Sequence, residues 1–170
     1  MEFRDVLLSR KSCREYVDMK VEKEKLDQVV TSGSLAPLGM PRMGKPHLTV
    51  ITDPGTMKAL GYIAGPDRDA IYGAPALIVV SCPDVPRPGL SRMNAACVVE
   101  MMSLAATDLG LANIYLYGVT MGLSKNEEMM KKIGIPEGYI PLSRLALGYS
   151  KEGIAQCKEF AEVLEKNEIL

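Results

Sequence analysis

The sequence predicts one domain in which helices and strands share a single core. A length of 170 residues suits one hydrophobic core and is short for two. The content of 47% hydrophobic and 24% charged residues is that of an ordinary globular protein. Strand-like and helix-like segments alternate, which favours a parallel, doubly wound sheet, although mixed α+β layers also fit. No repeat, low-complexity tract or linker divides the chain, so we expect one domain over residues 1–170.

The first third of the chain predicts two helices and a loop. Residues 2–9 place apolar side chains at spacings of three and four, which is typical of a short amphipathic helix. Residues 22–34 predict a second helix, with acidic residues in its first turn and Gly33 near its end. Residues 36–46 contain three prolines and two glycines, so they cannot form regular structure and are expected to be a loop.

The middle of the chain predicts two buried strands and two helices. Residues 47–52 and 76–82 are rich in β-branched residues and bounded by proline or glycine. Between them, residues 53–65 predict a short capped helix. Residues 93–110 predict a helix that is apolar nearly all round its circumference. Such a helix must be buried on every side, in the centre of the domain or against a second subunit.

The last third predicts two strands and two helices, at residues 111–119, 124–134, 143–150 and 153–170. In the first of these helices, Ser124 is the expected N-terminal cap and Gly134 the expected stop. The second is an amphipathic helix that closes the chain.

Composition argues against several classes of partner. The chain has 20 basic and 21 acidic side chains, so nothing attracts it generally to nucleic acid or to anionic membranes. No secretory signal and no apolar run of about 18 residues is evident, so a cytoplasmic location is expected. The four cysteines are scattered and the only histidine is His47, so no metal site is expected.

The common catalytic motifs are also missing. The chain contains no G-x-S-x-G, no G-x-x-x-x-G-K-[ST] and no H-E-x-x-H. A serine or cysteine nucleophile would have to use His47, which opens a predicted strand. If the protein is an enzyme, a cofactor is therefore expected to supply the chemistry.

The segment SRKSCREY, residues 9–16, is the main concentration of anion-binding groups near the start of the chain. Arginine donates bidentate hydrogen bonds to phosphate, and a serine hydroxyl can add another. Arg10, Ser12 and Arg14 alternate just past a helix, so they could converge on one phosphate. The other interpretation is a solvated helix end whose cations interact with the helix dipole.

Several segments together favour the first interpretation. SRKSCREY resembles the R-R-S-x-R-x-[FY] opening of the nitroreductase family of FMN-dependent oxidoreductases, with Lys11 in place of the second arginine. The resemblance continues, in family order and as far as about residue 150, through APLGMPRMGKPHLTVI, GAPALIVV, NAACVVEMMSLAATDLGLANIYLYG and IGIPEGYIPLSRLALGYS.

The resemblance implies an α+β fold with a central, mostly antiparallel sheet flanked by helices, which replaces the parallel sheet that alternation favours. It also implies an intertwined homodimer with FMN at the subunit interface, each site drawing residues from both chains. The apolar helix at 93–110 would then form the dimer core.

The resemblance also implies roles for individual residues. Arg10, Lys11, Ser12 and Arg14 match the family segment that holds the phosphate, the ribityl chain and the edge of the isoalloxazine ring. Gly118 matches the glycine whose backbone borders the flavin closely, which the absence of a Cβ permits.

Two segments depart from the family pattern. The loop has M-G-K-P-H where the family has N-x-Q-P-W, which leaves Met43 and Lys45, or the loop backbone, as the candidate contacts to FMN. The connection at 65–73 is short, so the site is expected to be open or covered by another element. Lys158 is the candidate for a further phosphate contact, or else a surface lysine of the closing helix.

The function implied is an FMN-dependent oxidoreductase that passes hydride from NAD(P)H through FMN to a nitroaromatic, a quinone or a similar small acceptor by a ping-pong mechanism. The altered loop motivates an alternative, a flavin-binding protein without NAD(P)H turnover that stores, senses or processes flavin. A domain that binds a phosphate ligand without flavin is the third possibility.

Overall fold

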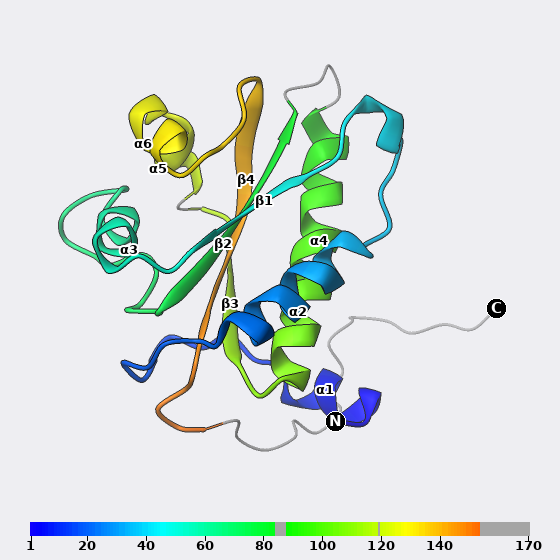
Figure 1. Ribbon diagram of the computed structural model, residues 1–170, viewed down its shortest axis with the longest axis vertical. Coiled ribbons are helices and arrows are strands. Elements are labelled where there is room, and N and C mark those ends of the chain that lie inside the picture. The colour runs from blue at the N-terminus through cyan, green and yellow to red at the C-terminus, as the bar shows by residue number, and fades with distance from the viewer. Residues whose placement is uncertain (84–87, 119, 154–170) are drawn as a thin grey trace, which may run out of the picture.

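A computed structural model describes residues 1–83, 88–118 and 120–153, apart from the side chains of Met43 and Pro88. A four-stranded sheet lies at its centre (Figure 1). The strands are β1 (His47–Ile51), β2 (Ala76–Pro83), β3 (Ala112–Leu116) and β4 (Tyr139–Gly148). They are ordered β1-β2-β4-β3, and every neighbouring pair is antiparallel.

The parallel sheet favoured by the alternation of elements is therefore wrong, and the antiparallel α+β sheet implied by the family resemblance is confirmed. Helix–strand alternation does not decide strand direction, because a helix can lie in a connection that returns along the neighbouring strand. The helix α3 (Pro54–Gly61) does so between the antiparallel strands β1 and β2.

The helices divide between the two faces of the sheet (Figure 1). The long helix α4 (Pro88–Asp108) covers one face, with α2 (Lys23–Ser34) packed on it and α1 (Phe3–Ser9) near its end. On the other side lie α3 and the short helices α5 (Thr120–Ser124) and α6 (Glu127–Lys132).

Each face of the sheet contributes to its own hydrophobic core, because successive strand residues point to opposite sides. Ile78 and Leu145 belong to the core shared with α2 and α4. Val79 and Ala146, the next residues along the same strands, belong to the core on the side of α3, α5 and α6. We call the two sides the α4 face and the pocket face.

Most predicted elements are present with shifted ends. The helices at 2–9 and 22–34 and the strand at 47–52 correspond to α1, α2 and β1. The loop at 36–46 contains one 3-10 turn, η1 (Pro41–Met43). The strand expected at 143–150 begins earlier, at Tyr139.

The helix predicted at 124–134 is present as α6, but it starts later, and Ser124 as its cap is wrong. Ser124 ends α5 and its hydroxyl donates to the carbonyl of Met121 at 2.9 Å. The second helix, α6, is capped instead by Asn126, whose side chain accepts from the backbone N–H of Met129 at 2.9 Å. Gly134 follows α6 with φ of +76°, as expected of a helix stop.

The apolar helix expected at 93–110 starts earlier, and the single chain does not bury it on every side. One side of α4 packs on the sheet and on α2, with Val99 and Met102 fully buried. On the other side, Met93 is 62% exposed and Glu100 is exposed. The expectation of complete burial is therefore wrong for one chain.

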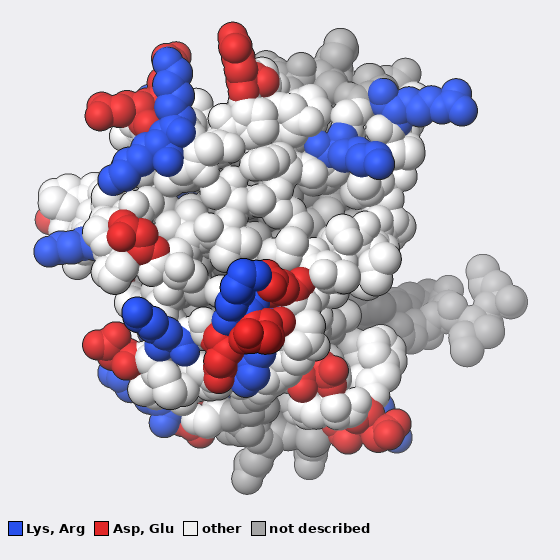
Figure 2. Space-filling view, viewed as in Figure 1, with Lys and Arg blue, Asp and Glu red and all other residues white. Residues whose placement is uncertain are grey.

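The surface and the remaining predictions add three findings. In the face shown in Figure 2, basic and acidic side chains are interspersed, as suits a chain of net charge −1. None of the helices in the described ranges is long and apolar enough to cross a lipid bilayer. The predicted closing helix, from residue 154 on, lies outside the described residues.

Candidate functional site

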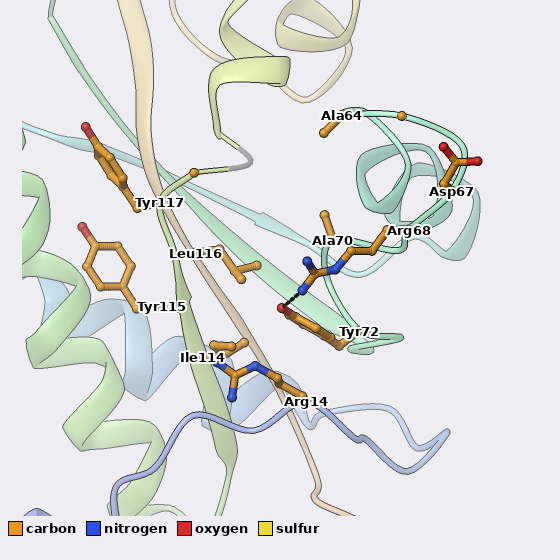
Figure 3. Close-up of a pocket in the computed structure, with 12 residues that line it drawn as sticks. Arg14, Ala64, Asp67, Arg68, Ala70, Tyr72, Ile114, Tyr115, Leu116 and Tyr117 are labelled. Carbon is orange, nitrogen blue, oxygen red and sulfur yellow. Dashed lines mark hydrogen bonds between the residues drawn. The ribbon is translucent and has the colours of Figure 1, made fainter.

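A pocket of about 490 Å³ lies beside the end of β3 (Figure 3). Three parts of the chain line it: Arg14, the connection from Ala64 to Tyr72, and the segment from Ile114 to Gly118. These parts are far apart in sequence, so the tertiary structure alone assembles the pocket.

The edge strand β3 presents different side chains to its two sides, as Figure 3 shows. Ile114 and Leu116 are buried in the core of the pocket face. Tyr115 and Tyr117 point to the opposite side and are 42% and 55% exposed. The Tyr115 hydroxyl lies 2.9 Å from the Ser143 hydroxyl on β4, which fixes that ring on the α4 face.

Arg14 reaches the pocket because the preceding segment attaches to β3. Ser12 forms an isolated parallel bridge with Asn113, and the N–H of Cys13 donates to the Asn113 carbonyl at 2.9 Å. The side chain of Cys13 is buried in the core of the pocket face. Arg14, the next residue, is exposed and lines the pocket.

Two guanidinium groups gather on the ring of Tyr72. Arg14 lies 5.9 Å and Arg68 lies 5.4 Å from the ring centroid, within the range of cation–π contacts. Arg68 also donates to the Tyr72 hydroxyl at 2.6 Å. Tyr72 has φ of +58°, a left-handed conformation that is uncommon outside glycine.

The charge of the pocket suits an anion. In the part of the chain that the structure describes, neither Arg14 nor Arg68 forms an ion pair with a carboxylate. Asp67 also lines the pocket, but Figure 3 shows it at the outer end of the loop, away from Arg14. Arginine groups held by an aromatic ring remain free to donate to phosphate or carboxylate oxygens.

Of the predicted site residues, the structure brings Arg14 and Gly118 together in this pocket. Lys11 forms an ion pair with Glu152 at 3.1 Å and lines a separate, much smaller hollow. Arg10 is half-buried and Ser12 is exposed, on the stretch that leads to Arg14.

Of the remaining predicted residues, the structure places only Lys45, which does not line the pocket. Lys45 is exposed in the loop after η1, which lies near one end of α4 (Figure 1). The side chain of Met43 and the whole of Lys158 lie outside the described residues.

Sequence reasoning missed two groups of site residues. Arg68 and Tyr72 lie in a segment that was predicted to be only a connection between a helix and a strand. Nothing in the local sequence indicates that Tyr72 contacts Arg14. Arg144 was hidden in a predicted strand, although a charged residue between apolar neighbours in SRLALG is a usable signal.

Arg144 is the most unusual polar group in the described part of the chain. Its side chain is fully buried on β4, and Nε, Nη1 and Nη2 have no hydrogen-bond partner among the described residues. Burial lowers the pKa of its guanidinium to about 10, so the group stays charged near neutral pH.

These residues fit an anionic, ring-containing ligand such as FMN. Arginines supply donors for a phosphate, and Arg144, a cation without a partner in the described part of the chain, lies in the core next to the pocket wall. A Cβ added at Gly118 would meet nothing within 4 Å, so a flat ring can approach that backbone closely.

Solved structures share this architecture along the whole chain. A nitroreductase with bound FMN from Bacteroides fragilis aligns with a TM-score of 0.83, 24% identity and complete coverage of both chains. A nitroreductase with bound FMN from Desulfitobacterium hafniense gives the same TM-score and coverage at 25% identity. This chain has the nitroreductase fold.

Curated sequences agree with that identification. A protein of Archaeoglobus fulgidus, provisionally named an NADH dehydrogenase/NAD(P)H nitroreductase, is 28% identical over 158 residues, which cover 86% of this chain and 84% of the relative. A protein of the same name from Methanothermobacter thermautotrophicus is 26% identical over 155 residues, 89% of this chain and 79% of the relative. No family model matches the sequence. The nitroreductase resemblance of the sequence is confirmed by these relatives and by the fold.

Proposed function

We propose that this protein is an FMN-dependent oxidoreductase that takes electrons from NAD(P)H and passes them to a small acceptor such as a nitroaromatic or a quinone. The observation that carries the proposal is the pocket that joins Arg14 to Gly118 within a nitroreductase fold. The names of the relatives, which include FMN and NAD(P)H, support it.

Specific residues would bind and orient the cofactor. Arg14, with Arg10 and Ser12 on the same segment, would hold the phosphate and the ribityl chain. Gly118 would border the ring. FMN, when bound, supplies the hydride-accepting chemistry, and the described residues supply anchoring, orientation and positive charge. This division of labour agrees with a chain that contains one histidine and no nucleophile motif.

A homodimer would complete the site. Apolar side chains at the exposed side of α4 and at α1 support it, because Met93 is 62% and Phe3 is 68% exposed in one chain. In a dimer, the loop that carries Met43 and Lys45 would contact the flavin of the partner subunit. That arrangement would account for the absence of Lys45 from the pocket of its own chain.

The alternative, a flavin-binding protein without NAD(P)H turnover, is favoured by one observation. The loop lacks the asparagine and glutamine of the family pattern, so it offers no amide side chain to the flavin. A weakly held or poorly oriented ring would then bind without efficient hydride transfer.

An absorbance spectrum of the purified protein, followed by anaerobic titration with NADH and then NADPH, tests the proposal. We expect a flavin spectrum that bleaches rapidly with at least one nicotinamide. Initial rates measured with both NAD(P)H and acceptor varied should give parallel double-reciprocal plots for a ping-pong mechanism. A protein that stays colourless after incubation with FMN would contradict the proposal. A flavin spectrum that neither nicotinamide bleaches would support the alternative.

The same titrations identify the preferred nicotinamide, and reoxidation of the reduced flavin by added nitroaromatics and quinones tests the acceptor. The cytoplasmic location and the single domain over residues 1–170 stay predictions.

A further inference from the structure

The buried guanidinium of Arg144, which has no hydrogen-bond partner among the described residues, is unfavourable for the stability of the fold. Removing a charged side chain from water without a partner costs several kcal/mol. Proteins are stable by only about 5–15 kcal/mol, so such a group is a large burden. Val79 and Ala146, which share its face of the sheet, show that apolar side chains fill the surrounding core.

The register of the sheet places Arg144 directly behind the pocket wall. It lies opposite Leu116 on β3 and opposite Val79 on β2. Leu116 lines the pocket, and α5 packs against β4. The first turn of α5 is tied to β3, because the Thr120 hydroxyl donates to the Leu116 carbonyl at 3.3 Å. Arg144 thus lies one strand away from the pocket, on a strand against which α5 packs.

No described carboxylate neutralises this charge. Asp69, on the connection before β2, accepts from the backbone N–H groups of Ile71 at 2.9 Å and Gly73 at 2.6 Å and forms no ion pair with an arginine among the described residues. Arg144 forms no ion pair in the described ranges. In a medium of low dielectric constant, an unneutralised charge acts over a longer distance than it does in water.

We infer that Arg144 is a buried positive charge that raises the electron affinity of a flavin bound in the pocket, through the wall formed by Leu116. The inference rests on the proposed function. A hydride from NAD(P)H brings two electrons and one proton, so its transfer leaves one additional negative charge on the ring. A fixed cation one strand away stabilises that charge without touching the ring. Arg144 therefore acts on the flavin only through its electrostatic field, and it is not a catalytic residue.

The reduction potential of the bound FMN tests this inference. We expect Arg144→Met to lower the ratio of affinities for reduced and oxidised flavin about tenfold, which is about 30 mV for a two-electron couple. Arg144→Lys keeps the charge and should retain most of the wild-type potential. The potential would be measured on the flavin-loaded protein by equilibration with a reference dye, and Lys23→Met on α2 serves as the charge-loss control on the other face.

The stability of the apoprotein is an independent measurement, and it should rise in the same variant whose reduction potential falls. If Arg144 is unpaired, Arg144→Met should raise the urea midpoint of unfolding, because a buried unpaired charge is replaced by an apolar side chain of similar length. A purely structural role, with a partner that holds the guanidinium, predicts a lower midpoint and an unchanged potential.

Several results would overturn the inference. An unchanged potential in Arg144→Met and in the neutral variant Arg144→Gln would refute it, and so would an apoprotein that becomes less stable or fails to fold. A wild-type protein that binds no FMN would instead overturn the proposed function. A wild-type protein that binds FMN and is reduced by NAD(P)H, with potentials insensitive to residue 144, would leave the proposed function standing.

Discussion

Buried polar side chains on the two faces of the sheet differ in whether they have hydrogen-bond partners. On the α4 face, Asn113 is 1% exposed and its amide is fully engaged: Oδ1 accepts from the Ser103 hydroxyl at 2.7 Å, and Nδ2 donates to the Ser103 carbonyl and the Thr107 hydroxyl, each at 3.2 Å. On the pocket face, Arg144 is equally buried and has no partner among the described residues.

The contrast separates buried polar groups that hold the fold from a buried charge whose field can act on a bound ligand. A satisfied buried network stabilises one arrangement of its elements, here α4 against β3. A buried polar group without a partner lowers stability, and a bound ligand that gains negative charge can interact with its field. Substitutions on the two faces should therefore change different measurements.

The largest effect on stability is expected from Asn113→Ala. The substitution leaves the buried Ser103 hydroxyl without its acceptor and removes the amide that donates to the Ser103 carbonyl and the Thr107 hydroxyl, although that carbonyl still accepts from Thr107, so the free energy of unfolding should fall by about 2–3 kcal/mol. Urea unfolding of the apoprotein measures it. The FMN affinity of the folded variant should stay within about threefold of wild type, and a loss of affinity without a loss of stability would break the contrast between the faces.

Arg14→Ala should have the opposite signature. Loss of a charge-assisted hydrogen bond should weaken FMN binding by about 1.5–3 kcal/mol, or roughly 10-fold to 150-fold, as measured by fluorescence titration. The apoprotein should unfold within about 0.5 kcal/mol of wild type, because Arg14 is exposed.

Lys23→Ala is the matched control for Arg14→Ala, since Lys23 is an exposed cation on α2, paired with Asp27. It should leave FMN affinity unchanged. Equal losses in both variants would mean that general charge attraction, and not the pocket, binds the cofactor.

Adding one methyl group at Gly118 or at Gly148 should separate effects on FMN binding from effects on stability. In Gly118→Ala the new Cβ meets no atom within 4 Å, so stability should hold within about 0.5 kcal/mol. FMN affinity should nevertheless fall by about 1 kcal/mol if the ring lies against this backbone. In Gly148→Ala the Cβ would meet Pro75 Cδ at 2.5 Å, so stability should fall by about 1–3 kcal/mol. Measuring both quantities on both variants would show whether Gly118 is kept for the ligand.

The smallest effect is expected from Glu152→Gln. The Lys11–Glu152 ion pair is solvent-exposed, with Glu152 71% exposed, so its loss should change the free energy of unfolding by less than about 0.5 kcal/mol. If Lys11 contributes to phosphate binding, freeing it should tighten FMN binding slightly, by up to about threefold. A weaker affinity in this variant would argue that Lys11 has no part in the site.

Much of the local structure could be predicted from the sequence. Strand and helix patterns located β1, β2, α1 and α2 to within a residue or so, because side-chain periodicity reports which faces are buried. Strand direction could not be predicted from alternation, and only the family resemblance indicated it. The break between α5 and α6 was missed because Asn126 is as good a cap as Ser124.

The candidate site also has features that the sequence predicts and features that only the tertiary structure decides. The phosphate-binding character of Arg14 and the small size of Gly118 are properties of the residues themselves, so the sequence by itself pointed to both. That they share a pocket with Arg68 and Tyr72 was decided by the tertiary structure, because those residues come from segments more than forty residues apart in the chain. Arg144 shows this division most clearly. Its charge can be read from the sequence, but whether the guanidinium has a hydrogen-bond partner depends on its neighbours in space. Only the folded chain determines those neighbours.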